Sequence, residues 1–148
     1  MAAQRIHLKG PYRYDEAYAG AANILPGMLL IKNSSDQCVI HATEGGRGEC
    51  MIGLEDALQG SIVSTAYTIS NIMPFMICQK GTEFYGLLED GQNAIIGSEL
   101  MSTGNGKFKL IGDLESGETL AQVIAHAIEA KDLTGSNTSD TLTKMRAV

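Results

Sequence analysis

Short apolar segments separated by turn-forming residues run through most of the chain and predict a mainly β fold. Clusters of Asn, Asp, Ser and Gly lie between them, and these residues favour tight turns. The predicted strands are residues 28–32, 37–43, 50–55, 72–79, 83–88, 98–102, 107–111 and 141–148. The turns at 33–36 and 103–106 predict hairpins, the second from its Asn-Gly pair. We therefore expect a small β-barrel or β-sandwich built of hairpins.

Residues 120–130 allow two interpretations. Their alanines and length permit a helix, whereas their apolar alternation fits a strand. An internal similarity favours the strand. A hairpin opened by Pro26-Gly27 leads to Leu54-Glu55, and roughly seventy residues later a hairpin opened by Gly97-Ser98 leads to Ile128-Glu129. We predict two related β-units, with chance similarity between common hairpin sequences as the alternative.

The N-terminal residues 1–23 lack hydrophobic periodicity and predict an extended arm, followed by a single β-rich domain over residues 24–148. The arm carries Arg5, Lys9 and Arg13 without an acid before residue 15, although the whole chain has a net charge of −6. Such a polar segment is expected to order only against a partner. The alternatives are a solvated tail and an arm that lies on an acidic neighbour, either another copy or a different protein.

Composition and charge exclude several classes of protein. No apolar run reaches the ~18 residues of a membrane span, and the N-terminus lacks the apolar core of a secretion signal. An acidic body repels phosphate backbones, which argues against nucleic-acid binding. The three cysteines include no Cys-x-x-Cys pair, so neither a disulfide framework nor a zinc ribbon is predicted. We expect a soluble protein that folds in a reducing cytoplasm.

The sequence offers no convincing catalytic or metal-binding motif. Cys38 and His41 would point to opposite faces of a strand and cannot share a metal ion. The glycine-rich loop 45–49 lacks the Lys-Ser/Thr ending of a phosphate-binding loop, and no serine lies in a Gly-x-Ser-x-Gly turn. We therefore expect no enzymatic activity, no cofactor and no metal.

The order of several segments resembles a known family. They are 26–30 (PGMLL), the loop 42–48, 53–60 (GLEDALQG), 87–97 (LLEDGQNAIIG), 104–107 (GNGK), 127–130 (AIEA) and the strand 140–148. Over residues 20–148 this order is similar to that of the head decoration, or capsid cement, proteins of tailed bacteriophages. These are patterns of turns and strands and contain no catalytic signature.

The resemblance implies a structural virion protein bound in many copies to the outer surface of the capsid. It would clamp neighbouring major capsid subunits and stabilise the head. Family members are most often homotrimers, and dimers also occur. The expected partners are the major capsid protein and further copies of this chain, without nucleic acid or membrane. The expected location is the virion surface, and the host cytoplasm during assembly.

The arm supplies the candidate capsid contacts. Its basic residues can form charge-assisted hydrogen bonds to carboxylates of the capsid, and its apolar and aromatic residues can bury area. The candidate contact residues are Arg5, Ile6, Leu8, Lys9, Tyr12, Arg13 and Tyr14.

Two other functions remain as alternatives. A β-sandwich recognition module would bind carbohydrate or another surface ligand. The chain has no Trp and five Tyr, which is a sparse supply of rings for stacking on sugars. A small hydrolase is opposed by the missing catalytic motifs.

Overall fold

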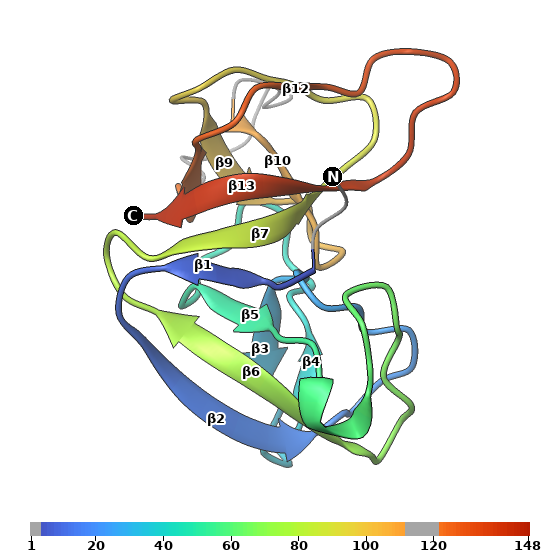
Figure 1. The fold of residues 1–148 in the computed structure, drawn as a ribbon. Helices are drawn as coiled ribbons and strands as arrows, with labels where there is room; N and C mark the ends of the chain where they lie inside the picture. Colours follow the sequence, from blue (N-terminus) through green and yellow to red (C-terminus); the bar gives the residue numbers. More distant parts are fainter. Residues whose placement is uncertain (1–3, 112–121) are drawn as a thin grey trace.

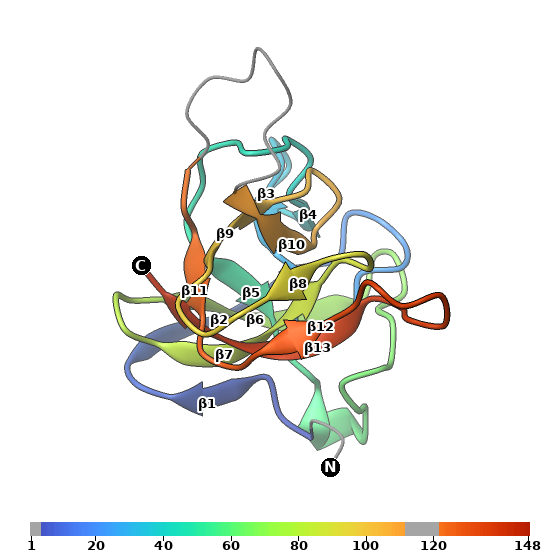
Figure 2. The ribbon, with the colours of Figure 1, turned by 90° about the horizontal axis from the view of Figure 1, so that it is seen from above.

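The computed structural model describes residues 4–111 and 122–148, and β-strands are the main element of this part of the chain (Figures 1 and 2). The strands are β1 (His7–Lys9), β2 (Tyr12–Tyr18), β3 (Leu30–Lys32), β4 (Cys38–Ile40), β5 (Met51–Gly53), β6 (Ile72–Cys78), β7 (Glu83–Leu88), β8 (Asn93–Ala94), β9 (Glu99–Ser102), β10 (Phe108–Leu110), β11 (Ala125–Ala127), β12 (Lys131–Asp132) and β13 (Thr141–Ala147). One short 3₁₀ helix, η1 (Ala57–Gln59), follows β5. The described residues contain no α-helix, and hence none that could span a membrane. The predicted mainly β fold is confirmed.

A closed five-stranded barrel forms the second half of the chain and occupies the upper part of Figure 1. Its strands follow the order β7-β10-β9-β11-β13, and β13 pairs again with β7 to close the ring. The β7–β10 pairing is parallel, and the other pairings of the ring are antiparallel. Closure leaves no free sheet edge within the ring.

The first half of the chain has the same order of strands and lies in the lower part of Figure 1. The sheets β2-β6-β5 and β3-β4 are joined by two isolated bridges. One is the parallel bridge Ala19–Cys38, and the other is the antiparallel bridge Leu29–Ile52. We call residues 12–78 the first β-unit and residues 83–147 the second β-unit.

The register of the two β-units matches pair by pair. In the hairpins, Leu30–Ile40 is equivalent to Leu100–Leu110. Between the parallel strands, Ala19–Cys38 is equivalent to Leu88–Phe108. Where β5 and β11 each meet their hairpin, the Gly27–Gly53 backbone hydrogen bond is equivalent to the Gly97–Ala127 hydrogen bond. The prediction of two related β-units is therefore confirmed. The predicted strand at 120–130 is confirmed only at its centre, Ala125–Ala127; residues 120–121 lie outside the described part of the chain.

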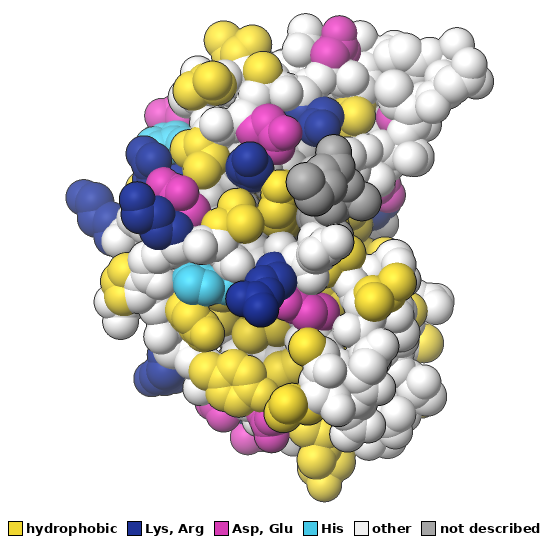
Figure 3. Space-filling view, in the orientation of Figure 1, with side chains coloured by type: hydrophobic (Ala, Val, Ile, Leu, Met, Phe, Trp, Pro, Cys, Tyr) yellow, Lys and Arg dark blue, Asp and Glu magenta, His cyan; other side chains and the backbone are white. Residues whose placement is uncertain are grey.

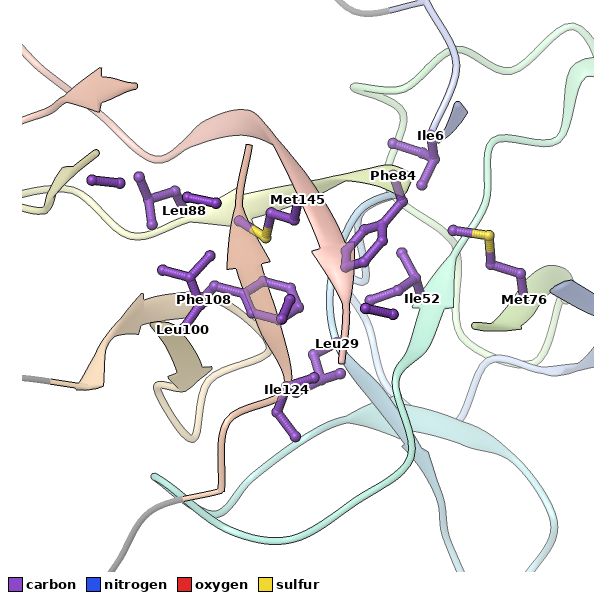
Figure 4. Packing of buried hydrophobic residues seen from close by; sticks show 14 of the residues in the cluster. Ile6, Leu29, Ile52, Met76, Phe84, Leu88, Leu100, Phe108, Ile124 and Met145 are labelled. Atoms are coloured by element: carbon purple, nitrogen blue, oxygen red, sulfur yellow. The ribbon is translucent and has the colours of Figure 1, made fainter. Parts of the chain in front are cut away.

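The N-terminal segment is extended but is not a free arm. Strand β1 pairs with β7, and β2 pairs with β6 along its whole length. The Ile6 side chain is 0% exposed and packs against Phe84 and Ile52 in the core between the two β-units (Figure 4). The structure thus corrects the expectation that this segment orders only against a partner: burial of Ile6 and two sets of strand pairings order it on its own chain.

Candidate interaction surface

Strand β2 is an edge strand with an open backbone edge. It pairs with β6 along one side, and on its other side the chain meets β4 only directly after the strand, at the Ala19–Cys38 bridge. The Ala19 N–H donates to the Asn71 carbonyl at 2.8 Å, so the backbone groups of the odd-numbered residues face β6 and those of the even-numbered residues point away. Among the outward groups, the Glu16 N–H is bonded by the neighbouring Asp15 carboxylate at 2.8 Å. In the described part of the chain no strand pairs with the outward groups of Tyr12 and Tyr14, so a further strand can pair there.

Exposed aromatic side chains line one face of this edge. Tyr12, Tyr14 and Tyr18 alternate along β2 and are 38%, 51% and 56% exposed, and Ile72, opposite Tyr18 on β6, is 53% exposed. We call these four residues the tyrosine surface. Figure 3 shows yellow side chains gathered over β2 and β6 at the lower part of this view. Tyrosines in such a row provide large contact area at a small cost in side-chain entropy.

Polar contacts hold two of these rings in place. The Tyr12 ring packs on His7, with ring centroids 4.2 Å apart. The Tyr14 hydroxyl donates to Glu16 Oε1 at 2.6 Å. This hydrogen bond, with partial burial and the Glu16 charge, raises the pKa of Tyr14 to about 12. Contacts within the chain thus position both rings.

The opposite face of β2 has a different character. Arg13 and Asp15 lie there and line an open cleft of about 300 Å³ together with Lys32 and Glu49. The Lys32 ammonium lies 5.5 Å from the centre of the Phe75 ring in this cleft. Arg13 is therefore separated from Tyr12 and Tyr14 by the strand itself.

The structure divides the seven predicted contact residues. Ile6 is buried, and its side chain is not available to a partner. Arg5 and Lys9 are exposed beside β1, where Leu8 is 38% exposed. Within the described residues, neither Arg5 nor Lys9 forms an ion pair. Figure 3 shows basic side chains over β13, β7 and β1, above the tyrosine surface.

Sequence reasoning missed two members of the tyrosine surface, Tyr18 and Ile72. The signal for Tyr18 was present, because Tyr12, Tyr14 and Tyr18 follow the period of two of a strand. Ile72 had no such signal, since its position opposite Tyr18 depends on the β2–β6 register.

A second open cleft, of about 710 Å³, lies between the loop after η1 and the second β-unit. Its walls include Ile62, Val63 and Leu142, and the Glu129–Lys131 ion pair, with its charged atoms 4.0 Å apart, lies at its side. Asp140 also lines this cleft and pairs with Lys107 at 2.8 Å, so apolar walls and paired charges together can hold an amphipathic group.

The Cys38–His41 pair is structural. Cys38 is buried, and both ring nitrogens of His41 have protein partners. His41 Nδ1 lies 2.8 Å from Ser102 Oγ, and Nε2 lies 3.2 Å from the Arg47 carbonyl oxygen. Over residues 4–111 and 122–148, no group of three or more His, Cys, Asp or Glu side chains is placed to hold a metal ion.

Comparisons with known proteins add a likeness of fold. No family model matches the sequence, and no curated protein matches it. The crystal structure of the head fiber gp8.5 N base of bacteriophage phi29 is similar to this chain, with a TM-score of 0.54 and 9% sequence identity. The likeness covers 93% of this chain and 95% of that chain. The fold is therefore similar over nearly the whole of both chains, while few residues are identical.

Proposed function

We propose that this protein is a structural component of a phage head, bound to the outer surface of the capsid. The observation that carries the proposal is the fold shared, over almost the full length of both chains, with the head fiber base of phi29. The arrangement of segments that resembles head decoration proteins supports it independently. In this proposal the protein is not an enzyme and needs no cofactor.

The proposed capsid contact is the tyrosine surface together with the open edge of β2. A segment of the major capsid protein would pair with the outward backbone groups of β2, and Tyr12, Tyr14 and Tyr18 would supply buried area. Arg5 and Lys9 would add charge-assisted bonds to capsid carboxylates. Neither nucleic acid nor membrane takes part.

Cement function follows from many weak contacts acting together. A trimer or dimer of this chain would touch several neighbouring capsid subunits at once. Each contact after the first is then intramolecular, so the whole assembly clamps the shell much more tightly than one copy does. The same attachment would serve a protein that stands on the head as the base of a fiber.

The direct test is sedimentation with empty, expanded shells assembled from the major capsid protein encoded in the same genome. We expect the wild-type chain to pellet with the shells and to saturate at a fixed number of copies. The triple variant Tyr12→Ser, Tyr14→Ser, Tyr18→Ser should lose at least about tenfold in affinity, because hot-spot aromatic residues each contribute about 2 kcal/mol or more. Absence of saturable binding by the wild-type chain would refute the proposal.

A matched control removes exposed apolar area elsewhere. Ile95 and Ile96 are 65% and 71% exposed in the second β-unit, away from β2. The double variant Ile95→Ser, Ile96→Ser should bind shells as the wild-type does. If it loses binding and the tyrosine variant keeps it, the contact lies on the second β-unit.

The exposed row of tyrosines also supports a second candidate, a carbohydrate-binding module, because aromatic faces stack on sugar rings. Sugar binding would be measured on a glycan array with the wild-type chain and the tyrosine variant. Binding to sugars that disappears in the variant, with no binding of the wild-type chain to shells, would favour this candidate.

A further inference from the structure

Two of the three cysteines face each other across neighbouring strands. Cys50 lies directly before β5, and Cys78 is the last residue of β6. The Cys78 N–H donates to the Cys50 carbonyl at 2.9 Å, and the adjacent residues Met51 and Ile77 are paired in register. Cys50 and Cys78 are therefore directly opposite in an antiparallel pair, with both side chains on the same face of the sheet.

This position suits a disulfide bond. Directly opposite residues in a hydrogen-bonded antiparallel pair have Cα atoms about 5.5 Å apart. That separation lies within the range of disulfides, whose Cα atoms are most often about 5.5–6 Å apart. The Cβ atoms of such a pair, about 4.5–5.5 Å apart, would have to approach to about 3.5–4.5 Å, so oxidation would draw the two strands together at this point. The two thiols already interact, since a hydrogen bond with Cys78 raises the pKa of the Cys50 thiol, and burial raises it further.

Small molecules can reach the pair, whereas they cannot reach the third cysteine. Cys50 and Cys78 are both partly exposed and line an open cleft of about 230 Å³. The side chain of Cys38 is 0% exposed, in the core of the first β-unit. A thiol reagent should therefore distinguish the pair from Cys38.

We propose that Cys50 and Cys78 form a reversible disulfide that joins β5 to β6. The oxidant is a low-molecular-weight disulfide such as glutathione disulfide. The thiolate of one cysteine attacks a glutathione sulfur, breaks the S–S bond and releases one glutathione thiolate. The thiolate of the second cysteine then attacks the protein sulfur of the mixed disulfide and releases the second glutathione. Two protein thiols are oxidised, one glutathione disulfide is reduced to two thiols, and the two protons pass to the released thiolates.

The bond would join β5 and β6 at the end of the pair away from their connecting loop, and would enclose both strands and this loop, the longest connection between strands in the first β-unit, in one covalent ring. Residues 54–71 join β5 to β6, contain η1 and carry Leu58, which is 97% exposed. A cross-link across this loop restricts the unfolded chain, so the oxidised protein should have a Tm higher by about 5–10 °C. This inference is independent of the proposed function.

The experiment uses the full-length chain, purified with reductant and then incubated at pH 8 in glutathione disulfide. We expect the number of reactive thiols in the denatured protein to fall from three to one, and to return to three with dithiothreitol. No Lys or Arg lies between Gly48 and Gln79, so trypsin leaves both cysteines in one peptide. Cleavage after Glu49 and Glu55 separates them, and mass spectrometry should find the two peptides joined.

The second β-unit provides a matched control. Its equivalent pair is Ile124 and Val148, in which the Val148 N–H donates to the Ile124 carbonyl at 3.2 Å. In a Cys50→Ser, Cys78→Ser background, Ile124→Cys with Val148→Cys should also form a bond, because the same cross-strand geometry applies. Cys38→Ala should leave the oxidation of Cys50 and Cys78 unchanged.

Three results would overturn the proposal. They are three thiols remaining after incubation of the wild-type chain, a stable glutathione adduct without an internal bond, and a bond that involves Cys38. A Cys50–Cys78 bond without a rise in Tm would overturn its stabilising role. Peptide mapping of the wild-type chain decides the bonding even if a serine variant fails to fold.

Discussion

The two β-units share their strand order and register but differ at one sheet edge. In the second β-unit, β1 covers the outer edge of β7, and the Tyr85 N–H donates to the Ile6 carbonyl at 2.8 Å. The equivalent position in the first β-unit is Glu16, whose N–H is bonded by the Asp15 side chain. The edge of β7 is thus covered by another strand of the chain, whereas in the described structure no strand covers the edge of β2 at Glu16.

The residues around each edge fit this difference. Ile6, directly before the covering strand, is buried beside Phe84 (Figure 4), whereas Tyr14, on the open strand, is half-exposed. The same polar N-terminal segment therefore serves two purposes. Its first strand stabilises the fold, and its second strand presents a surface.

The largest expected effect comes from removing the anchor of β1. Ile6→Ala leaves a cavity between the two β-units and should lower the free energy of unfolding by about 2–5 kcal/mol. Leu8→Ala, at a position 38% exposed on the same strand, should cost less than about 1 kcal/mol. Urea unfolding of both variants measures the difference. Equal effects would mean that Ile6 is not the anchor.

The next comparison uses two equivalent glycines. Gly27 and Gly97 both have positive φ, 86° and 93°, at the start of each hairpin. An added Cβ at Gly27 would lie 2.5 Å from Leu142 Cδ2 and 3.1 Å from the Tyr85 carbonyl oxygen, whereas at Gly97 it meets nothing within 4 Å.

Gly97→Ala should therefore lower the free energy of unfolding by about 1–2 kcal/mol, through backbone strain alone. Gly27→Ala should cost about 1–3 kcal/mol more, because the core must also shift. Thermal unfolding of the two variants tests this order. A larger cost at Gly97 would contradict the close approach of the two β-units at Gly27.

A smaller effect is expected at two equivalent glutamates. Glu55 Oε2 accepts the Ile6 N–H at 3.0 Å, and Glu129 Oε2 accepts the Lys144 N–H at 3.1 Å. Each carboxylate thus ties its β-unit to a neighbouring segment. Glu55→Ala and Glu129→Ala each leave a backbone N–H without its acceptor and should lower the free energy of unfolding by about 1–2 kcal/mol. The Glu49 side chain accepts no such hydrogen bond among the described residues, so Glu49→Ala should lower it by about 0.5 kcal/mol or less. Chemical denaturation of the three variants distinguishes these outcomes.

Much of the fold could be predicted because its turns are local. The turns at 33–36 and 103–106 place both hairpins, and the apolar-Glu steps at Leu54-Glu55 and Ile128-Glu129 indicate the repeat. The equivalence of β2 with β7, and of β6 with β13, left no such local signal. It is defined by pairings between strands far apart in the sequence.

The N-terminal segment shows why the candidate site was only partly predicted. The tyrosines that alternate along β2 face outward. Their alternation in the sequence therefore does not indicate a buried face, and the sequence alone suggests an unpaired arm. The burial of Ile6 depends on Phe84 and Ile52, which no local pattern connects to it. Tyr12 and Tyr14 became candidate contact residues because aromatic side chains in a polar segment can supply buried area to a partner.

The smallest expected effect is the pH response of Tyr14 on the open edge. Its pKa is raised from 10.0 to about 12, first by its hydrogen bond to Glu16 and then by partial burial. The folded protein therefore favours the neutral phenol, so this contribution to stability is complete below pH 10 and is lost as the pH rises towards 12.

Tyr14→Phe removes the hydrogen bond and this pH dependence. The difference in stability between wild-type and Tyr14→Phe should thus shrink between pH 9 and pH 12, and ultraviolet titration should show one late-titrating tyrosine fewer in the variant. Tyr12→Phe, whose hydroxyl has no hydrogen bond among the described residues, serves as the control and should keep the number of late-titrating tyrosines of the wild-type. If the tyrosine lost in Tyr14→Phe titrates near pH 10 and not late, Glu16 does not hold this ring.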